Sequence, residues 1–146
     1  MAKVKKALAE EEFKRTEKAG SDGPASTLSG ILIEALEIEE VQRTLAETAS
    51  LTNLTLHQQT DLQTRRTSLL KRIRRMRENQ IAHLPTLNNL VNAISSEITA
   101  EKIPLLLPSS FDVRMRASVF PAFVLELEDR LRYAQAFEAL STLRGL

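Results

Sequence analysis

Apolar residues recur along two long stretches of the chain with the spacing of an α-helix. In the first stretch, which begins at Ser26 or Thr27, positions at alternating intervals of four and three residues are Ile31, Ala35, Ile38, Gln42, Leu45 and Ala49. In the second stretch, residues 56–83, the stripe is made of Leu62, Leu69, Ile73 and Met76. Both patterns are typical of a coiled-coil seam and predict two amphipathic helices that pack through it.

The break between these stretches is less distinct than the stretches themselves. Residues 50–55 are poor helix formers, but they contain neither Gly nor Pro. The second helix has a clear end, because Leu84 precedes Pro85 and a residue before proline avoids the α region. Two helices of similar length with a short break between them predict a long antiparallel helical hairpin.

The sequence pattern of the C-terminal half predicts further helices. Residues 86–101 have the spacing of a shorter helix, and the two prolines of 103–108 require an extended apolar stretch. Ser109 or Ser110 is expected to cap a short segment. A last helix is predicted from Phe120 or Pro121 to Leu143. Its apolar positions are Val124, Leu127, Leu131 and Ala134, continued in a shifted phase by Phe137 and Leu140. The predicted fold is therefore all-α, a coiled-coil-like hairpin with an additional C-terminal helix.

Three regions follow along the chain. Residues 1–19 predict a charged N-terminal helix, and residues 20–26, which contain two Gly and a Pro, predict a flexible joint. Residues 27–146 are expected to form one helical bundle domain. The N-terminus lacks the apolar core of a signal peptide, and no apolar run reaches the roughly 20 residues that span a bilayer. We therefore expect an intracellular protein, nuclear or cytoplasmic, without a membrane partner.

Composition excludes several kinds of chemistry. The 146 residues include no Cys and two His, which leaves no thiol catalysis and little for a metal site. Only four Gly are present, and no glycine-rich phosphate loop or nucleophile elbow occurs. No carboxylate pair stands at catalytic spacing. We expect no enzyme activity, no cofactor, no metal and no small-molecule substrate.

The net charge of +1 conceals two opposed blocks. Residues 34–47 carry five Glu and one Arg, whereas residues 65–77 carry seven of the twenty basic residues and no acid. The basic residues are Arg65, Arg66, Lys71, Arg72, Arg74, Arg75 and Arg77. One interpretation is that they pair with the acidic helix across the hairpin. The alternative is that they bind the phosphate backbone of DNA or RNA, which arginine contacts bidentately.

Three stretches of the chain together resemble the C-terminal portion of the fungal Kyakuja-Dileera-Zisupton transposases. They are Glu34-Ala-Leu-Glu-Ile-Glu-Glu-Val-Gln-Arg43, Leu62-Gln-Thr-Arg-Arg-Thr-Ser-Leu-Leu-Lys-Arg-Ile-Arg-Arg75 with Gln80 and Leu84-Pro85, and Leu107-Pro-Ser-Ser110 with the segments 128–136 and 139–144. The resemblance follows the family's order and approximate spacing over most of the chain. It covers the helical tail and not the catalytic core, so no catalytic residue of the family has a counterpart here.

The resemblance and the seam together imply a non-enzymatic module for protein–protein interaction or assembly, derived from a transposase tail. The expected partner is another protein or a second copy of the chain, as in a homodimer. The candidate helix-packing seam is Ile31, Ala35, Ile38, Leu45, Leu62, Leu69, Ile73 and Met76. Accessory nucleic-acid binding through residues 65–77 is the alternative function.

Overall fold

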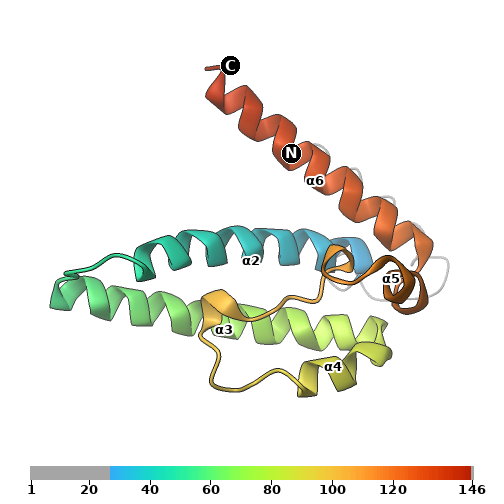
Figure 1. The fold of residues 1–146 in the computed structure, drawn as a ribbon, viewed down its shortest axis with the longest axis horizontal. Coiled ribbons are helices and arrows are strands. Elements are labelled where there is room, and N and C mark those ends of the chain that lie inside the picture. The colour runs from blue at the N-terminus through green and yellow to red at the C-terminus, as the bar shows by residue number, and fades with distance from the viewer. Residues whose placement is uncertain (1–26, 146) are drawn as a thin grey trace. The chain divides into compact units, whose positions relative to one another are not determined.

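A computed structural model describes residues 27–145 of the protein, and within this range it contains helices and loops but no strand (Figure 1). The all-α prediction is therefore confirmed. The predicted helix of residues 1–19 and the joint of residues 20–26 lie outside the described residues. The α-helices are α2 (Leu28–Ala49), α3 (Leu56–His83), α4 (Asn88–Asn92), α5 (Val113–Val119) and α6 (Ala122–Leu143). Short 3-10 helices are η2 (Pro85–Leu87), η3 (Ala100–Lys102) and η4 (Pro108–Ser110).

The described chain divides into two compact units, which we treat separately. The hairpin unit consists of residues 34–105 and contains most of α2, all of α3, and α4. The terminal unit consists of residues 27–33 and 106–145 and contains the first residues of α2 together with α5 and α6.

The helices of the hairpin unit are delimited by specific local interactions. The loop of residues 50–55 turns at Asn53, whose φ of 61° lies in the left-handed region that Asn tolerates better than most residues. Thr55 then caps α3 in a capping box with Gln58, in which each side chain accepts a hydrogen bond from the other residue's backbone N–H. At the other end, α3 stops at His83, directly before Leu84 and Pro85. These boundaries match the predicted helix of residues 56–83.

The hairpin unit buries the apolar sides of both long helices, which run side by side (Figure 1). Its buried apolar residues are Ala35, Leu36, Ile38, Leu45, Leu62, Leu69, Ile73, Met76, Leu84, Leu87, Ala100 and Leu105. All of the predicted seam residues that fall in this unit are among them. Each fully buried Leu or Ile side chain contributes about 1.5–3 kcal/mol to stability, so this burial is the main stabilising contribution to the unit.

Residues 100–105, which consist of η3 and the irregular residues 103–105, cross the long helices and are here called the strap. The Gln42 amide on α2 donates hydrogen bonds to the carbonyl oxygens of Ala100 and Ile103, at 3.0 and 2.9 Å. From α3, the Gln80 amide donates to the carbonyl oxygen of Leu105 at 3.2 Å. The strap is therefore held to both helices through its main chain.

The prediction of a helix over residues 86–101 is wrong beyond Asn92. The chain leaves the helix there and passes through turns and bends to η3. Ile94 and Ile98, which were expected to continue an apolar stripe, are only half-buried. Ser95 contributes to the break, because its hydroxyl accepts a hydrogen bond from the Glu97 N–H and so offers the backbone an alternative to the helix.

The terminal unit is built on the N-terminal half of α6. Val124, Leu127, Leu131 and Ala134 are buried, as is the carboxylate of Glu128. Glu128 accepts hydrogen bonds from the backbone N–H of Ser109 at 2.9 Å and from its hydroxyl at 2.7 Å. Arg132, one turn further along α6, pairs with the same carboxylate at 2.8 Å. This network fastens η4 to α6.

The expected cap at Ser109 or Ser110 is wrong. Asp112 caps the following helix, α5, by accepting a hydrogen bond from the Met115 N–H at 2.8 Å. The Ser109 hydroxyl instead donates to Glu128, and the Ser110 hydroxyl donates to the carbonyl oxygen of Leu107. A carboxylate at the N-terminal end of α5 also interacts favourably with the helix dipole, which favours Asp112 as the cap.

Candidate interaction surfaces

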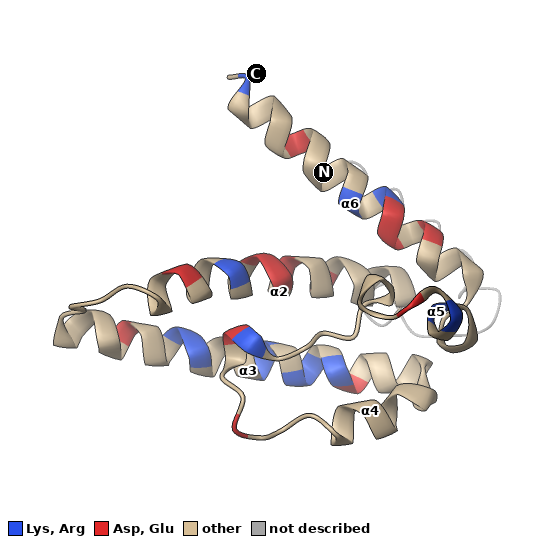
Figure 2. Ribbon diagram, in the orientation of Figure 1, with Lys and Arg blue, Asp and Glu red and all other residues tan. Residues whose placement is uncertain are grey.

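The basic residues of the chain concentrate on α3, whereas α2 carries mainly acidic residues (Figure 2). The structure separates the seven candidate cations of residues 65–77 into groups with different environments. Three of them bind groups elsewhere in the hairpin unit, one pairs within its own helix, and three point away from the core.

Arg66 binds the strap. Its guanidinium contacts both carboxylate oxygens of Glu101, with a shortest distance of 2.6 Å. The Glu101 side chain is only 2% exposed. Burial alone would raise the pKa of Glu101, but the hydrogen bond and charge of Arg66, with further bonds from the backbone and Thr99, outweigh burial and hold this pKa below its usual value. The hydrogen bond to Glu101 in turn raises the pKa of Arg66.

Arg72 meets the acidic helix. It contacts Glu34 at 2.6 Å and Glu37 at 3.0 Å, which ties α3 to α2. Hydrogen bonding to Glu34, followed by the charges of both carboxylates, raises the pKa of Arg72. Opposed charges of α2 and α3 therefore meet at this residue.

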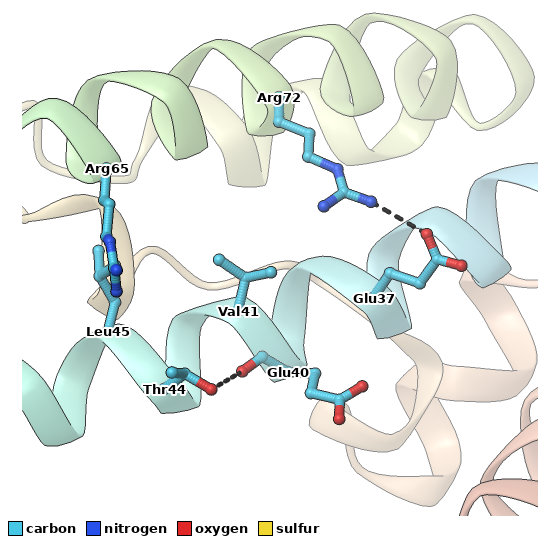
Figure 3. A pocket seen from close by; sticks show the side chains of 7 residues that line it. All are labelled: Glu37, Glu40, Val41, Thr44, Leu45, Arg65 and Arg72. Carbon is cyan, nitrogen blue, oxygen red and sulfur yellow. Dashed lines mark hydrogen bonds and ion pairs between the residues drawn. The ribbon is translucent and has the colours of Figure 1, made fainter.

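Beside this ion pair lies a pocket of about 460 Å³ between α2 and α3 (Figure 3). Arg65 and Arg72 line it from α3, and the α2 side is formed by Glu37, Glu40, Val41, Thr44 and Leu45. The Arg65 side chain is about half exposed and pairs with Asp61, one turn earlier on α3, at 3.1 Å. Both cations of this pocket are already paired, Arg72 with Glu37 and Arg65 with Asp61, so neither is a free group for an external anion.

Arg77 is buried, with 7% of its surface exposed. Its guanidinium donates to the carbonyl oxygens of Pro104 and Leu105 in the strap and to the side-chain oxygen of Gln80. Burial lowers the pKa of Arg77. No face of this guanidinium is open to an external phosphate, so the candidate role of Arg77 in anion binding is replaced by a structural one.

Lys71, Arg74 and Arg75 have a different environment. All three are exposed, and within residues 27–145 their side chains make no hydrogen bond or ion pair. Their spacing of three and four residues places them on one side of α3, opposite Leu69, Ile73 and Met76. We therefore narrow the candidate anion-binding set to these three residues.

Sequence reasoning missed the acceptors of the strap and the roles of Gln42 and Gln80. One signal was present, because Gln42 occupies a seam position and a polar residue in an apolar seam requires a buried partner. A second signal is that Arg66 follows Leu62 by four residues and Arg77 follows Ile73 by four. Both arginines therefore belong to the apolar side of α3 rather than to its solvent side.

The second candidate surface is the C-terminal half of α6. Four large apolar side chains are exposed there, namely Tyr133 (74%), Phe137 (64%), Leu140 (52%) and Leu143 (83%). Tyr133 lies directly before Ala134, where the buried stripe of the helix ends, and the other three follow it. We call these four residues the α6 stripe. It differs from the predicted seam, all eight residues of which are buried.

Within the described residues, no group of three potential metal ligands comes together, and no helix is both long and apolar enough to cross a bilayer. No protein-family model, curated protein or solved structure matches the chain.

Proposed function

We propose that the protein is a non-enzymatic interaction module that self-associates through the α6 stripe. The observation that carries this proposal is the exposure of Tyr133, Phe137, Leu140 and Leu143 on one regular helix. Large apolar side chains gathered on a surface mark interaction sites more often than singly scattered ones do. The predicted seam cannot serve this purpose, because the chain itself buries it.

A second helix is the partner geometry that fits this surface. Tyr133, Phe137 and Leu140 follow one another at four and three residues, and Leu143 comes three residues later. Such spacing presents one side of a helix to another helix. The surface covers residues 133–143, about three helical turns, whereas a coiled coil typically extends over at least three to four heptads, so we expect a weak and reversible association.

The partner to which the proposal commits is a second copy of the chain. An interface around a two-fold axis brings the same surface of each copy together, and an apolar stripe is complementary to itself. Between Arg132 and Arg144 the only charged residue is Glu138. Two copies can therefore approach without a row of like charges between them.

Sedimentation velocity over a range of protein concentrations tests the proposal. The wild-type protein should show a monomer–dimer equilibrium with a dissociation constant of roughly micromolar order. The double substitution Phe137→Glu and Leu140→Glu should give a monomer at all concentrations, because a dimer would then bury unpaired carboxylates.

A matched control changes two exposed apolar residues outside the stripe, Leu56→Glu and Val113→Glu. These side chains are 79% and 76% exposed, and the change in net charge is the same. The control should dimerise like the wild type. A wild-type protein that remains monomeric up to the highest soluble concentration, or a control that dissociates as readily as the stripe variant, would contradict self-association through α6.

The resemblance to a fungal transposase tail supports an assembly role, and we retain it as our proposal for the origin of the chain. The proposal also places the protein inside the cell, in the nucleus or cytoplasm. The absence of cysteine from the sequence agrees with this location.

A further inference from the structure

We propose that the outward side of α3 binds the phosphate backbone of a nucleic-acid duplex through Lys71, Arg74 and Arg75. This inference goes beyond self-association and does not depend on it, because the α6 stripe belongs to the other unit of the chain. The inference starts from the division of the basic residues 65–77 into cations that bind groups of the protein and cations that are exposed without such a partner in the described range.

The three cations form a compact group. Lys71 is one helical turn from both Arg74 and Arg75, and all three side chains are exposed. The same spacing places like charges beside one another, which destabilises an isolated helix unless an anion lies between them. Neighbouring cations such as Arg66 and Arg72 are held by carboxylates of the hairpin unit. No such carboxylate reaches these three within the described range.

The residues of α3 around these three cations favour the binding of a polyanion. Between Asp61 and Glu78, α3 contains no acidic residue. Apart from Arg65, which pairs with Asp61, the exposed positions of residues 63–68 are uncharged and polar, namely Gln63, Thr64, Thr67 and Ser68. Such side chains approach a phosphate backbone without repelling it. Glu78 is exposed at the C-terminal edge of the group and opposes the binding of an anion.

A duplex fits this surface better than a single strand or a membrane does. Binding of a single strand relies on aromatic side chains that stack on bases, and α3 has no aromatic residue. An interfacial membrane helix needs an apolar side to enter the lipid. The apolar side of α3 is buried in the hairpin unit, and its exposed residues from 63 to 78 are all polar.

Fluorescence anisotropy with a labelled 20-base-pair DNA duplex, titrated in a salt series, tests the proposal. Three neutralised phosphates give a slope of log K against log salt of about −2.7, which corresponds to roughly 40-fold weaker binding between 50 and 200 mM salt. Each single substitution, Lys71→Gln, Arg74→Gln or Arg75→Gln, should reduce the slope by about 0.9, and the triple substitution should abolish salt-dependent binding. In contrast, Glu78→Gln should strengthen binding about two- to fivefold.

The matched control removes three exposed cations outside α3 by the substitutions Arg43→Gln, Arg114→Gln and Arg144→Gln. It lowers the net charge by the same amount as the triple variant and should retain the wild-type slope. Parallel titrations use an RNA duplex of the same sequence, a DNA single strand, and vesicles that contain phosphatidylserine. The two duplexes differ in groove shape, so their ratio identifies which duplex is preferred, and both should bind more tightly than the single strand.

Four results would overturn the proposal. The first is the absence of duplex binding at about 50 mM salt, where phosphate contacts are strongest. The second is a salt slope that is unchanged in the single and triple variants, and the third is an equal loss of duplex binding in the matched control. The fourth is vesicle binding that depends on the three cations while duplex binding does not. Because all three side chains are exposed, the variants should fold, and their circular dichroism spectra check this. Dimerisation measured on the same variants should be unchanged, which separates this test from that of self-association.

Discussion

The two sides of α3 carry the same kind of residue in opposite circumstances. On the side that faces the strap, Arg66 and Arg77 are bound to a buried carboxylate and to main-chain carbonyl oxygens. On the solvent side, Arg74 and Arg75 are exposed and have no polar partner within the described range. Only a few residues separate the two groups along the helix. The comparison shows that one run of arginines can contain both buried structural groups and exposed cations without a partner in the described range.

The difference has a simple physical origin. A buried guanidinium loses its hydration and is tolerated only where enough acceptors replace the water. The strap supplies such acceptors, because its irregular backbone leaves carbonyl oxygens that no helix or sheet satisfies. Once bonded, Arg77 is required for stability, whereas an exposed arginine can be exchanged at little structural cost. The predictions below test this contrast, beginning with the largest expected effect.

The largest effect is expected for Arg77→Met. The substitution keeps most of the side-chain volume but removes the Arg77 donor from the carbonyl oxygen of Pro104, and it leaves that of Leu105 with the Gln80 amide alone. We expect a loss of about 2–4 kcal/mol in the free energy of unfolding, measured by urea denaturation. Arg75→Met is the matched control on the solvent side and should change stability by less than about 0.5 kcal/mol. Similar losses for both variants would remove the distinction between the two sides.

Next in size is the contribution of the Arg66–Glu101 pair, which depends on pH. The pKa of Glu101 is lower in the folded protein than its ordinary value of 4.5. The ionised carboxylate therefore stabilises the fold above about pH 4.5, and this stabilisation disappears as the pH falls through the lower, folded-state pKa.

Glu101→Gln should consequently destabilise the protein at pH 7 by about 1.5–3 kcal/mol, the range for a hydrogen bond to a charged group. The difference between wild type and variant should shrink as the pH is lowered from 5 to 3. Urea unfolding curves at several pH values measure this difference. If it stayed constant across that range, the ion pair would not be the source of the stabilisation.

The capping box of α3 should have a smaller effect on stability. This effect concerns the strap side and the solvent side of α3 equally. Thr55→Ala removes the hydroxyl that accepts the Gln58 N–H and should cost about 1 kcal/mol of stability. Thr64→Ala, in the exposed interior of the same helix, should be neutral or slightly stabilising, since alanine is the better helix former. Thermal unfolding followed by circular dichroism compares the two variants. Equal losses would show that the cap does not contribute specifically.

The smallest effect on stability is expected for the combined substitution of Lys71, Arg74 and Arg75 by Gln. Removing neighbouring like charges relieves repulsion, so the free energy of unfolding should rise or fall by less than about 0.5 kcal/mol. The measurement is urea denaturation of the triple variant at low salt. A large loss would mean that these side chains have structural partners and that the solvent side resembles the strap side after all.

Local patterns in the sequence predicted much of the fold. The all-α class, the limits of α3 and the end of α6 follow from periodicity, the proline at 85 and the glycine at 145, whose φ is 73°. Residues 103–105 of the strap are predicted as extended, whereas its first residues, Ala100 and Glu101, fall in the predicted helix of residues 86–101. The attachment of the strap depends on Gln42 and Glu101, which lie 58 and 35 residues from partners at Ala100 and Arg66. Periodicity within a helix contains no information on such distant pairs.

The candidate surfaces were predicted in part. The basic run pointed to α3, but its seven members were treated as one surface although Arg66 and Arg77 share the apolar side of the helix. For α6, the change of phase at Phe137 was visible in the sequence. Whether a shifted stripe is covered or exposed depends on which other segments pack against it. That information lies in tertiary structure and not in the spacing of one helix.

The hydrogen bonds of Arg77 to the strap have a consequence for which positions of this protein can accept substitutions during evolution. Their acceptors are main-chain oxygens, which every amino acid possesses. The side chain at 104, which is exposed, is therefore under little constraint from this contact. Position 77 has no such freedom, because no other side chain presents the same fork of donors. One invariant arginine would thus allow the segment that it holds to drift in sequence while keeping its place.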